Sequence, residues 1–361
     1  MGADSDYWHQ SPARWRAPDE DLVSIIALSR SGLTMAAMRR GAVAVACVSA
    51  LLVWVGPASA ASTRVIGRGT ARSCTSSAVV AAVRAGGRIR FSCGPKRVTI
   101  RMRATAKVLN SRREVVLDGG GLVTLSGAGR RRILYMDTCD PAQVFTTSHC
   151  QDQATPRLVV ENLTFVDGNS SGEAFDGGGG GAIFARGGRL RIVHSTFARN
   201  RCERSGPDVG GGAVRVLSQY HALPVAVTDS RFTDNVCSNG GALSSIGVSW
   251  NLAHSRFVGN RAIGHGANPS RPGTPGGGSG GAIYNDGNRF RLTITSSRLA
   301  SNHATEGGGA IFFVSNDRTG TLAIKDSVLQ ANRSDGFQTA GLPGIFFLGA
   351  ARPAIVDSVL R

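Results

Sequence analysis

Aromatic residues, lysines and long periodic helices are all scarce in this sequence of 361 residues. Phe, Trp and Tyr together make up 6% of the chain, and no long segment repeats apolar residues at the helical period, so a helical bundle is not expected. Both absences favour short strands joined by many turns. Glycine, in contrast, occurs 48 times, about twice its usual share of roughly 7%. It clusters in short runs, which indicates repeated turns.

Positive charge comes almost entirely from arginine. Lysine occurs only at Lys96, Lys107 and Lys325, yet the formal net charge is +17. A field of this sign attracts polyanions such as acidic polysaccharides, teichoic-type cell-wall polymers or nucleic acid. The sequence has no helix-turn-helix, zinc finger or aromatic-interleaved basic motif, so a specific nucleic-acid role is not expected. The composition therefore predicts an acidic polysaccharide or cell-wall polymer as partner.

The N-terminal segment predicts export by a Sec-type signal peptide at residues 35–60. Arg39 and Arg40 form a basic start at residues 38–40, and residues 41–55 are apolar. Residues 58–60 give the small-x-small pattern for cleavage before Ala61. The apolar run is shorter than the roughly 20 residues of a membrane span, so no stable insertion is expected after cleavage; a retained anchor is the alternative. Residues 1–34 are polar, and we expect an untranslated or disordered extension. A single secreted or surface-associated domain, 61–361, follows.

One phrase recurs through residues 158–361. It consists of an apolar-x-apolar strand, a polar residue that is usually Ser, an apolar anchor, and an Asn three residues after the anchor. The anchors, spaced 25 to 42 residues apart, are Phe165, Phe197, Phe232, Phe257, Leu299, Leu329 and Leu360. A period of about 30 residues with two or three short strands per repeat predicts an all-β solenoid of about seven or more coils.

Two aliphatic columns are expected to face the core of this solenoid, because they alternate with polar residues at period two. The column five residues before the anchors is Val160, Ile192, Val227, Leu252, Ile294, Ile324 and Ile355; the column seven before is Leu158, Leu190, Val225, Trp250, Leu292, Leu322 and Pro353. Each Asn of the phrase is expected at a corner in the left-handed conformation, with its amide bonded to the Asn above and below.

A second phrase, Gly-Gly-Ala-apolar, alternates with the first, from Gly180-Gly181-Ala182-Ile183 to Gly308-Gly309-Ala310-Ile311. Its Gly pairs predict corners where the backbone needs a positive φ or a close approach. Residues 74–95 are expected to form an N-terminal cap, with a short helix over residues 74–84 that covers the first coil.

Six cysteines remain after cleavage, and their even number agrees with an oxidising destination. Cys202 and Cys237 each lie two residues after an Asn of the repeat, so stacking places them within disulfide reach. The simple local partners for the other four are Cys74 with Cys93 and Cys139 with Cys150.

The alternating phrases resemble the GGA[ILV] and FxxN repeats of the chlamydial polymorphic outer-membrane proteins, with FxxN at 197–200, 232–235 and 257–260. The segment VVLDGGGLVTLSG, at 115–127, resembles the opening coil of pectate-lyase-like proteins. The resemblance implies a right-handed parallel β-helix and, as in some relatives, adhesion or surface display.

Two functions are open. The first is a non-catalytic secreted β-helix of adhesive or cell-wall-associated type, whose basic surface engages an anionic polymer. The alternative is a polysaccharide lyase or glycoside hydrolase acting on an acidic glycan. Resemblance to pectate lyases would then imply Ca²⁺ held by clustered acids and an Arg base, but no tight acid cluster is visible and no cofactor is evident. The fold itself hosts both functions.

Three residues before the anchors, His194, Asp229 and His254 fall on consecutive coils. Such a ladder would suit a metal or an acid–base pair, and a solvated polar corner is the other interpretation. Gly264-His265-Gly266 resembles the GHG of polygalacturonases. It lacks their paired-Asp motifs, and it lies in a Gly/Pro-rich insertion, 261–280, that we expect to be a surface loop.

Overall fold

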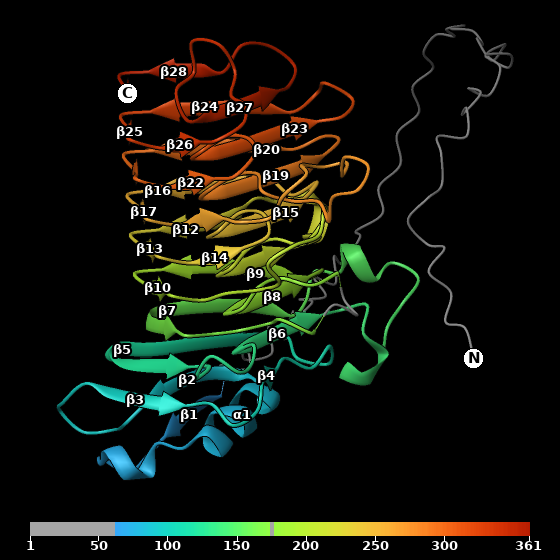
Figure 1. Cartoon of the computed structure of the whole chain (residues 1–361). Coiled ribbons are helices and arrows are strands. Elements are labelled where there is room, and N and C mark those ends of the chain that lie inside the picture. The colour runs from blue at the N-terminus through green and yellow to red at the C-terminus, as the bar shows by residue number, and fades with distance from the viewer. Residues whose placement is uncertain (1–61, 174–176) are drawn as a thin grey trace, which may run out of the picture. The chain divides into compact units, whose positions relative to one another are not determined.

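Equivalent strands of successive coils lie one above the other and pair in parallel (Figure 1). The computed structural model describes residues 62–173 and 177–361, so the expected extension at 1–34 and signal peptide at 35–60 lie outside the described residues. Within those residues the strands form three sheets of 17, 8 and 4 strands, named here sheets A, B and C. The fold is the parallel β-solenoid that the repeats predict.

Sheet A takes two strand segments from each regular coil, separated by a bend. Its N-terminal strands are β1 (Thr63–Ile66), β2 (Gly87–Phe91), β3 (Val98–Arg101), β5 (Glu114–Ser126) and β7 (Arg157–Val166). The later pairs are β9 (Arg189–Val193) with β10 (Thr196–Ala198), β12 (Val225–Thr228) with β13 (Arg231–Thr233), β16 (Trp250–Ala253) with β17 (Arg256–Val258), β20 (Arg291–Thr295) with β21 (Arg298–Ala300), β24 (Thr321–Lys325) with β25 (Val328–Gln330), and β28 (Ala354–Val356) with β29 (Val359–Leu360).

Sheets B and C close the coils. Sheet B comprises β4 (Ala106–Lys107), β6 (Leu134–Asp137), β8 (Ile183–Arg186), β11 (Val214–Val216), β15 (Leu243–Ile246), β19 (Ile283–Gly287), β23 (Ile311–Ser315) and β27 (Ile345–Leu348). Sheet C comprises β14 (Val236–Cys237), β18 (Arg261–Ala262), β22 (His303–Ala304) and β26 (Arg333–Ser334). Short 3₁₀ turns lie at Ala71–Ser73, Pro141–Gln143, Cys150–Asp152 and Tyr220–Ala222.

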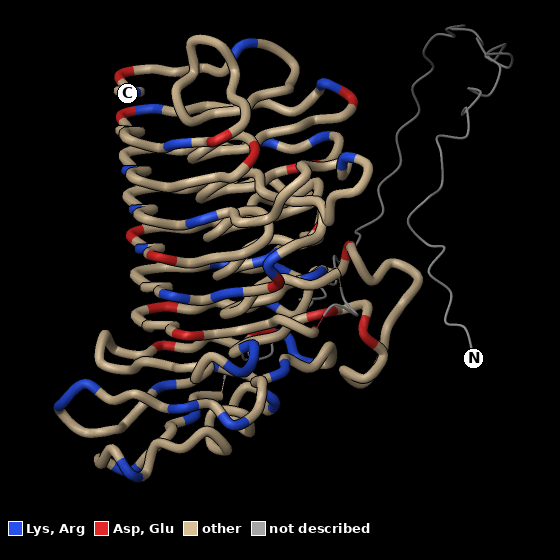
Figure 2. The backbone as a smooth tube through the Cα atoms, viewed as in Figure 1, with Lys and Arg blue, Asp and Glu red and all other residues tan. Residues whose placement is uncertain are grey.

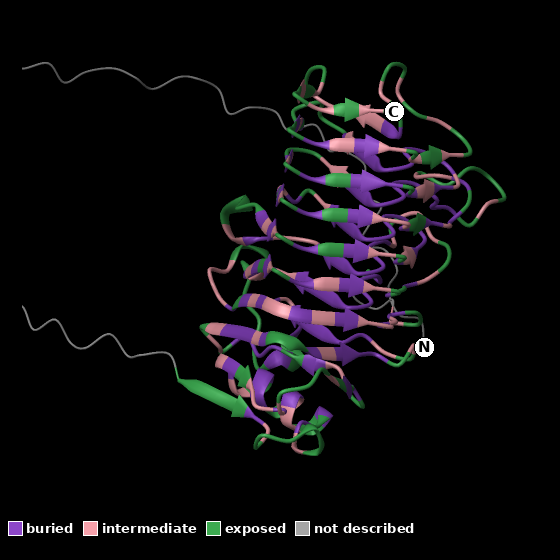
Figure 3. Ribbon diagram, turned by 90° about the vertical axis from the view of Figure 1, so that its left-hand side faces the viewer, coloured by how far each residue is buried: buried purple, intermediate pink, exposed green. Residues whose placement is uncertain are grey.

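The predicted anchors form one column inside the solenoid. Every anchor pairs in register with the next, from Phe165 with Phe197 to Leu329 with Leu360. The four Phe rings lie face to face, with centroids 4.9, 4.8 and 4.7 Å apart. The aliphatic column five residues earlier pairs in the same way, and the interior is buried along the stack (Figure 3). The sequence pattern therefore identified the core correctly.

Buried amides form a ladder at the corner after each anchor. Asn260 shows the arrangement: its Nδ2 donates to Phe232 O (3.0 Å) and to Asn302 Oδ1 (2.9 Å), and its Oδ1 accepts from the main-chain N of Asn235 (3.1 Å). The expected amide stacking is confirmed, but the left-handed conformation was assigned to the wrong residue. The residue before each Asn takes the positive φ, as at Arg199 (54°), because the Asn side chain must point inward to join the ladder.

A second ladder of hydroxyls stands at the bend within sheet A. Ser195, Ser230, Ser255, Ser297 and Ser327 are buried. Each main-chain N–H donates to the Ser Oγ of the next coil, as Ser230 N does to Ser255 Oγ (3.1 Å), and each hydroxyl donates to the carbonyl two residues earlier. The bend therefore leaves no polar group of these serines unpaired in the interior.

The two glycines of the Gly-Gly-Ala phrase have different tasks. The first has a positive φ, as at Gly280 (70°). A Cβ on the second would overlap backbone atoms of neighbouring coils; at Gly281 it would meet the carbonyl oxygen of Gly309. The predicted corner and the predicted close approach are both confirmed, one at each glycine.

Helix α1 (Ser76–Ala85) covers the first coil, with buried Val79 and Val83 in the common core. Its N-cap, Thr75, accepts a bond from Ala78 N, and Gly86 ends it with a φ of 74°. The structure contains the three expected disulfides, with Cα–Cα distances of 5.7 Å for Cys74–Cys93, 4.9 Å for Cys139–Cys150 and 4.8 Å for Cys202–Cys237.

Candidate functional site

The polar column that contains His194, Asp229 and His254 coincides with the bend inside sheet A. All its members have φ between 45° and 54°, which short polar residues tolerate better than branched ones. His194 Nε2 lies 3.4 Å from Asp229 Oδ2, with the side chains 60% and 44% exposed. His254 stands one coil further without an ion pair to Asp229. In residues 62–173 and 177–361, no three His, Cys, Asp or Glu side chains converge as a metal site would require.

Acids and an arginine converge on the outward face of sheet A near the N-terminal end. Arg88 contacts both Asp118 (3.4 Å) and Glu161, and Asn162 Nδ2 donates to Asp118 Oδ1 (3.0 Å). Burial raises the pKa of Asp118, but the bonds from Asn162 and the Gly120 amide, together with the charge of Arg88, outweigh it and hold the pKa below its usual value. This group is therefore an ion-pair cluster in which one guanidinium is shared between two carboxylates.

The GHG tripeptide lies among the contacts that attach the insertion to the solenoid. Glu306, which is buried, accepts two bonds of 2.8 Å from Arg271 and one of 2.7 Å from Gly266 N. Its Oε1 also lies 3.1 Å from Nδ1 of His265, whose side chain is two-thirds exposed (67%). The hydrogen bonds from Arg271 lower the pKa of Glu306. His265 thus helps to hold a surface loop against the solenoid. Within the expected insertion 261–280, Arg261–Ala262 form strand β18, and the loop follows them.

A polar cluster under the same insertion was missed by the sequence reasoning. Tyr284 Oη donates to Asp286 Oδ2 (3.0 Å), and Asn268 Nδ2 donates to both Asp286 (3.0 Å) and Asp208 (3.1 Å). Burial raises the pKa of Asp286, and nearby Asp208 adds to the rise. Tyr284 and Asp286 occupy outward positions of β19, two residues apart, so period two was the available signal. Asn268 comes from the loop, which the pattern could not place.

An open hollow of about 510 Å³ lies beside β11 and β15. Its lining includes the apolar Leu217, Ile246 and Val248 and the polar Asp152 and His221, with His221 Nε2 3.9 Å from Asp152 Oδ2. Asp152 lies two residues after Cys150, which closes a loop with Cys139.

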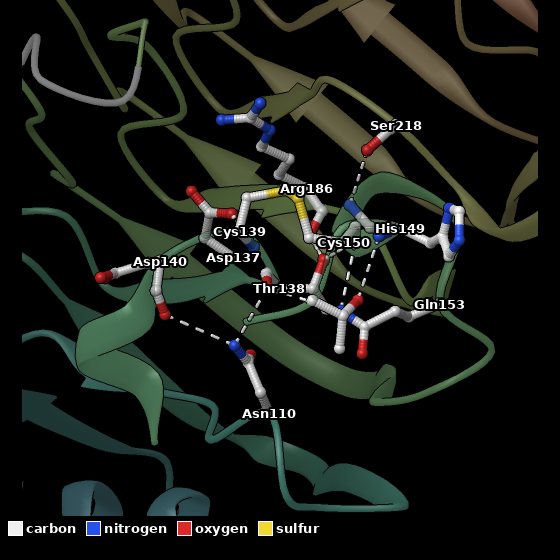
Figure 4. The surroundings of a disulfide bond; sticks show 12 residues. Asn110, Asp137, Thr138, Cys139, Asp140, His149, Cys150, Gln153, Arg186 and Ser218 are labelled. Atoms are coloured by element: carbon white, nitrogen blue, oxygen red, sulfur yellow. Dashed lines mark hydrogen bonds between the residues drawn. A yellow bond between two sulfur atoms is a disulfide. The ribbon is translucent and has the colours of Figure 1, made fainter. Parts of the chain in front are cut away.

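Hydrogen bonds hold that disulfide loop in place (Figure 4). Nδ2 of the buried Asn110 donates to the carbonyls of Thr138 (3.2 Å) and Phe145 (2.7 Å). These bonds tie the loop between Cys139 and Cys150 to the solenoid.

Charge is distributed very unevenly along the solenoid. Residues 62–132, named here the basic end, contain 16 Lys and Arg and two acids, a net charge of +14. The 229 residues from 133 to 361 contain 20 Lys and Arg and 17 acids, a net charge of +3. Lys and Arg accordingly mark the cap and first coils, while both signs mix above them (Figure 2).

Most cations of the basic end are available to a ligand. Twelve of the 16 are exposed. Among the described residues, Arg88 and Arg132 are the members of this set that contact an acidic side chain. The exposed members, such as Arg97, Arg101 and Arg103, present their charged groups to solvent.

In comparisons with known proteins, no protein-family model, curated protein or solved structure matches the chain. Within residues 62–173 and 177–361, no helix has the length and apolarity of a membrane span.

Proposed function

We propose that this protein is an exported, non-catalytic β-helix that binds anionic polymers through its basic end. The observation that carries the proposal is the concentration of a net +14 into residues 62–132, against +3 in residues 133–361. Three disulfides support an extracellular setting, because such bonds persist in oxidising compartments. Export by the segment at 35–60 completes the proposal.

The chemistry of the basic end suits acidic polysaccharides or cell-wall polymers. Arginine presents a planar fork of donors that matches carboxylate and phosphate groups. An uncompensated positive end also raises the local concentration of a polyanion and speeds its encounter with the protein. Like other electrostatic polymer binding, the interaction should weaken steeply with salt. Surface or wall association is the consequence for the exported protein.

An acidic-glycan lyase is the second candidate, and the convergence of Arg88, Asp118 and Glu161 on the outward face of sheet A is the feature that favours it. In such an enzyme the two acids would hold Ca²⁺ and the arginine would take the proton. The present contacts instead pair the arginine with both acids, so the binding function is preferred.

The test uses the full-length chain, purified from an exporting host, on immobilised polyuronate, teichoic acid and a neutral glucan. We expect binding to both anionic polymers and none to the glucan. The variant R97Q/R101Q/R103Q should lose most of this affinity. A matched variant, R204Q/R289Q/R318Q, removes three exposed charges outside the basic end and should change it little. Equal losses in the two variants, or binding to the glucan, would overturn the proposal.

The same samples distinguish the enzyme. Incubation with polyuronate and Ca²⁺, followed by the ultraviolet absorbance of unsaturated products, reports lyase turnover. Turnover that disappears with a chelator and in R88Q would establish the second candidate in place of the first.

A further inference from the structure

A ladder of arginines runs along the solenoid outside the basic end. Arg231, Arg256 and Arg298 occupy the same outward position of β13, β17 and β21. The strands pair in register, Arg231 with Arg256 and Arg256 with Arg298. Neighbouring parallel strands lie about 4.8 Å apart, so the three side chains begin at that spacing.

These arginines are neither buried nor compensated by direct contact. All three are exposed, and none has an ion pair or side-chain hydrogen bond to any described residue, whereas Arg199 of the preceding coil pairs with Asp167 at 2.9 Å. Asp229 and Asp234 flank Arg231 at the bends on either side, and His254 precedes Arg256. Three like charges at one strand spacing repel one another, and a bound anion at each level would relieve this repulsion.

The column beside the ladder consists of small or medium side chains: Ala198, Thr233, Val258 and the buried Ala300. A polymer laid along the solenoid axis would therefore meet the guanidinium groups without a steric barrier. Sheet C adds Arg261 and Arg333 around the corner, with His303 in register between them.

We infer that the Arg231–Arg256–Arg298 ladder is a binding site for a linear polycarboxylate, such as a polyuronate, that runs parallel to the solenoid axis. The inference deepens the proposed function, since it names the polymer class and adds a second site. One coil supplies one guanidinium about every 4.8 Å, and a polymer with one carboxylate per sugar offers anions at a comparable interval. Among the described residues the ladder and the column beside it carry no aromatic side chain on which bases would stack, which disfavours single-stranded nucleic acid.

The experiment measures the affinity of a fluorescent oligogalacturonate by anisotropy over a range of salt concentrations. The variant R231Q/R256Q/R298Q should bind at least about tenfold more weakly, and its slope of log K against log salt should be shallower by about two, since each lost contact removes about 0.7. The matched variant R204Q/R289Q/R318Q should stay within about threefold of the natural protein. Equal effects in the two variants would overturn the inference.

Spacing provides a second, independent readout. The same oligogalacturonate with most carboxyls methyl-esterified should bind the natural protein and the ladder variant equally, because isolated charges cannot engage three levels. A preference of the natural protein for the esterified chain, or for single-stranded nucleic acid, would also refute the inference. The central substitution R256Q alone, with a Tm measurement, checks that the loss follows the ladder and not the fold.

Failure of this inference and failure of the proposed function have different signatures. If the natural protein binds oligogalacturonate and only R97Q/R101Q/R103Q loses affinity, the basic end acts alone and the ladder is not a site. If the natural protein binds no polyanion, both proposals fall.

Discussion

Removing one amide from the middle of the asparagine ladder should destabilise the solenoid strongly. Asn260→Ala deletes four side-chain hydrogen bonds: to Phe232 O, to Asn302 Oδ1, and from the main-chain N and Nδ2 of Asn235. All these groups are buried, so water cannot replace the lost partners. At about 1 kcal/mol for each bond, the expected loss is about 4 kcal/mol.

The assay is equilibrium unfolding in guanidinium chloride, followed by far-ultraviolet circular dichroism with the disulfides intact. The natural protein, Asn260→Ala and Asn332→Ala are compared at one pH. Asn332, at the half-exposed end of the ladder, makes three such bonds. Because water can partly replace the lost partners there, its loss should cost about 2 kcal/mol and not the roughly 3 kcal/mol of three buried bonds. An unchanged denaturant slope in all three would show that the same surface unfolds.

A cost below about 1 kcal/mol for Asn260→Ala would refute the reasoning, because it would mean that the ladder amides gain little over their hydration in the unfolded chain. An equal cost at both positions would refute a narrower point, namely that burial decides the size of the effect.

The remaining predictions concern the corners, a disulfide and the insertion. Gly281→Ala should cost about 2–4 kcal/mol because its Cβ meets backbone, whereas Gly247→Ala, with a φ of 64° and open space, should cost about 1 kcal/mol; similar Tm shifts would contradict this. Removing the Cys202–Cys237 disulfide, which closes 35 residues, should cost about 4 kcal/mol in chemical unfolding, and a loss below about 1 kcal/mol would argue against the entropic cause. The pKa of Glu306 is lowered from 4.5, so the contribution of its carboxylate to stability is complete above that pH and is lost as the pH falls through the folded pKa. Glu306→Gln should therefore flatten the acid limb of a Tm–pH profile. An unchanged limb would show that this carboxylate does not cause it. Replacing His194 and His254 by Ala should abolish metal binding or activity if the histidine ladder is functional, and unchanged behaviour would remove it as a candidate.

The core could be predicted because each coil needs apolar side chains at the same inward positions. The anchors Phe165 to Leu360 and the aliphatic columns carry the same residue type at the same offset in every coil, so alignment of the sequence with itself gives the register. The Cys202–Cys237 disulfide followed from that register, whereas Cys74–Cys93 and Cys139–Cys150 were expected as local partners. The stacking of residues far apart in the sequence could thus be predicted, although a single copy of the phrase is weak evidence.

The predictions were wrong at positions where the backbone conformation does not depend on the residue type. The left-handed position before the ladder Asn is Arg199, Asp234, Gly259, Ser301 or Ala331, five different residue types, so no pattern marks it. The glycines of the segment VVLDGGGLVTLSG do not interrupt its strand either. They lie within the single strand β5, in which an irregularity between Asp118 and Val123 absorbs them.

The candidate sites were harder to predict, because they depend on what the loops bring together. Asn268 reaches Tyr284 and Asp208 only through the fold of the insertion. The arginine ladder was present in the alignment at one offset from the anchors, but exposure and lack of acidic partners decide its importance, and neither can be read from the sequence.

The uniform interior also separates two properties that most domains couple, namely what a protein displays and what keeps it folded. Coils of 25 and 42 residues stack with the same internal contacts, because the longer one sends its extra residues out as the loop that follows β18. Length can therefore change by whole coils, and decoration by whole loops, without redesign of neighbouring coils. Each added coil would extend the solenoid by the same step of about 4.8 Å and leave the existing coils unchanged.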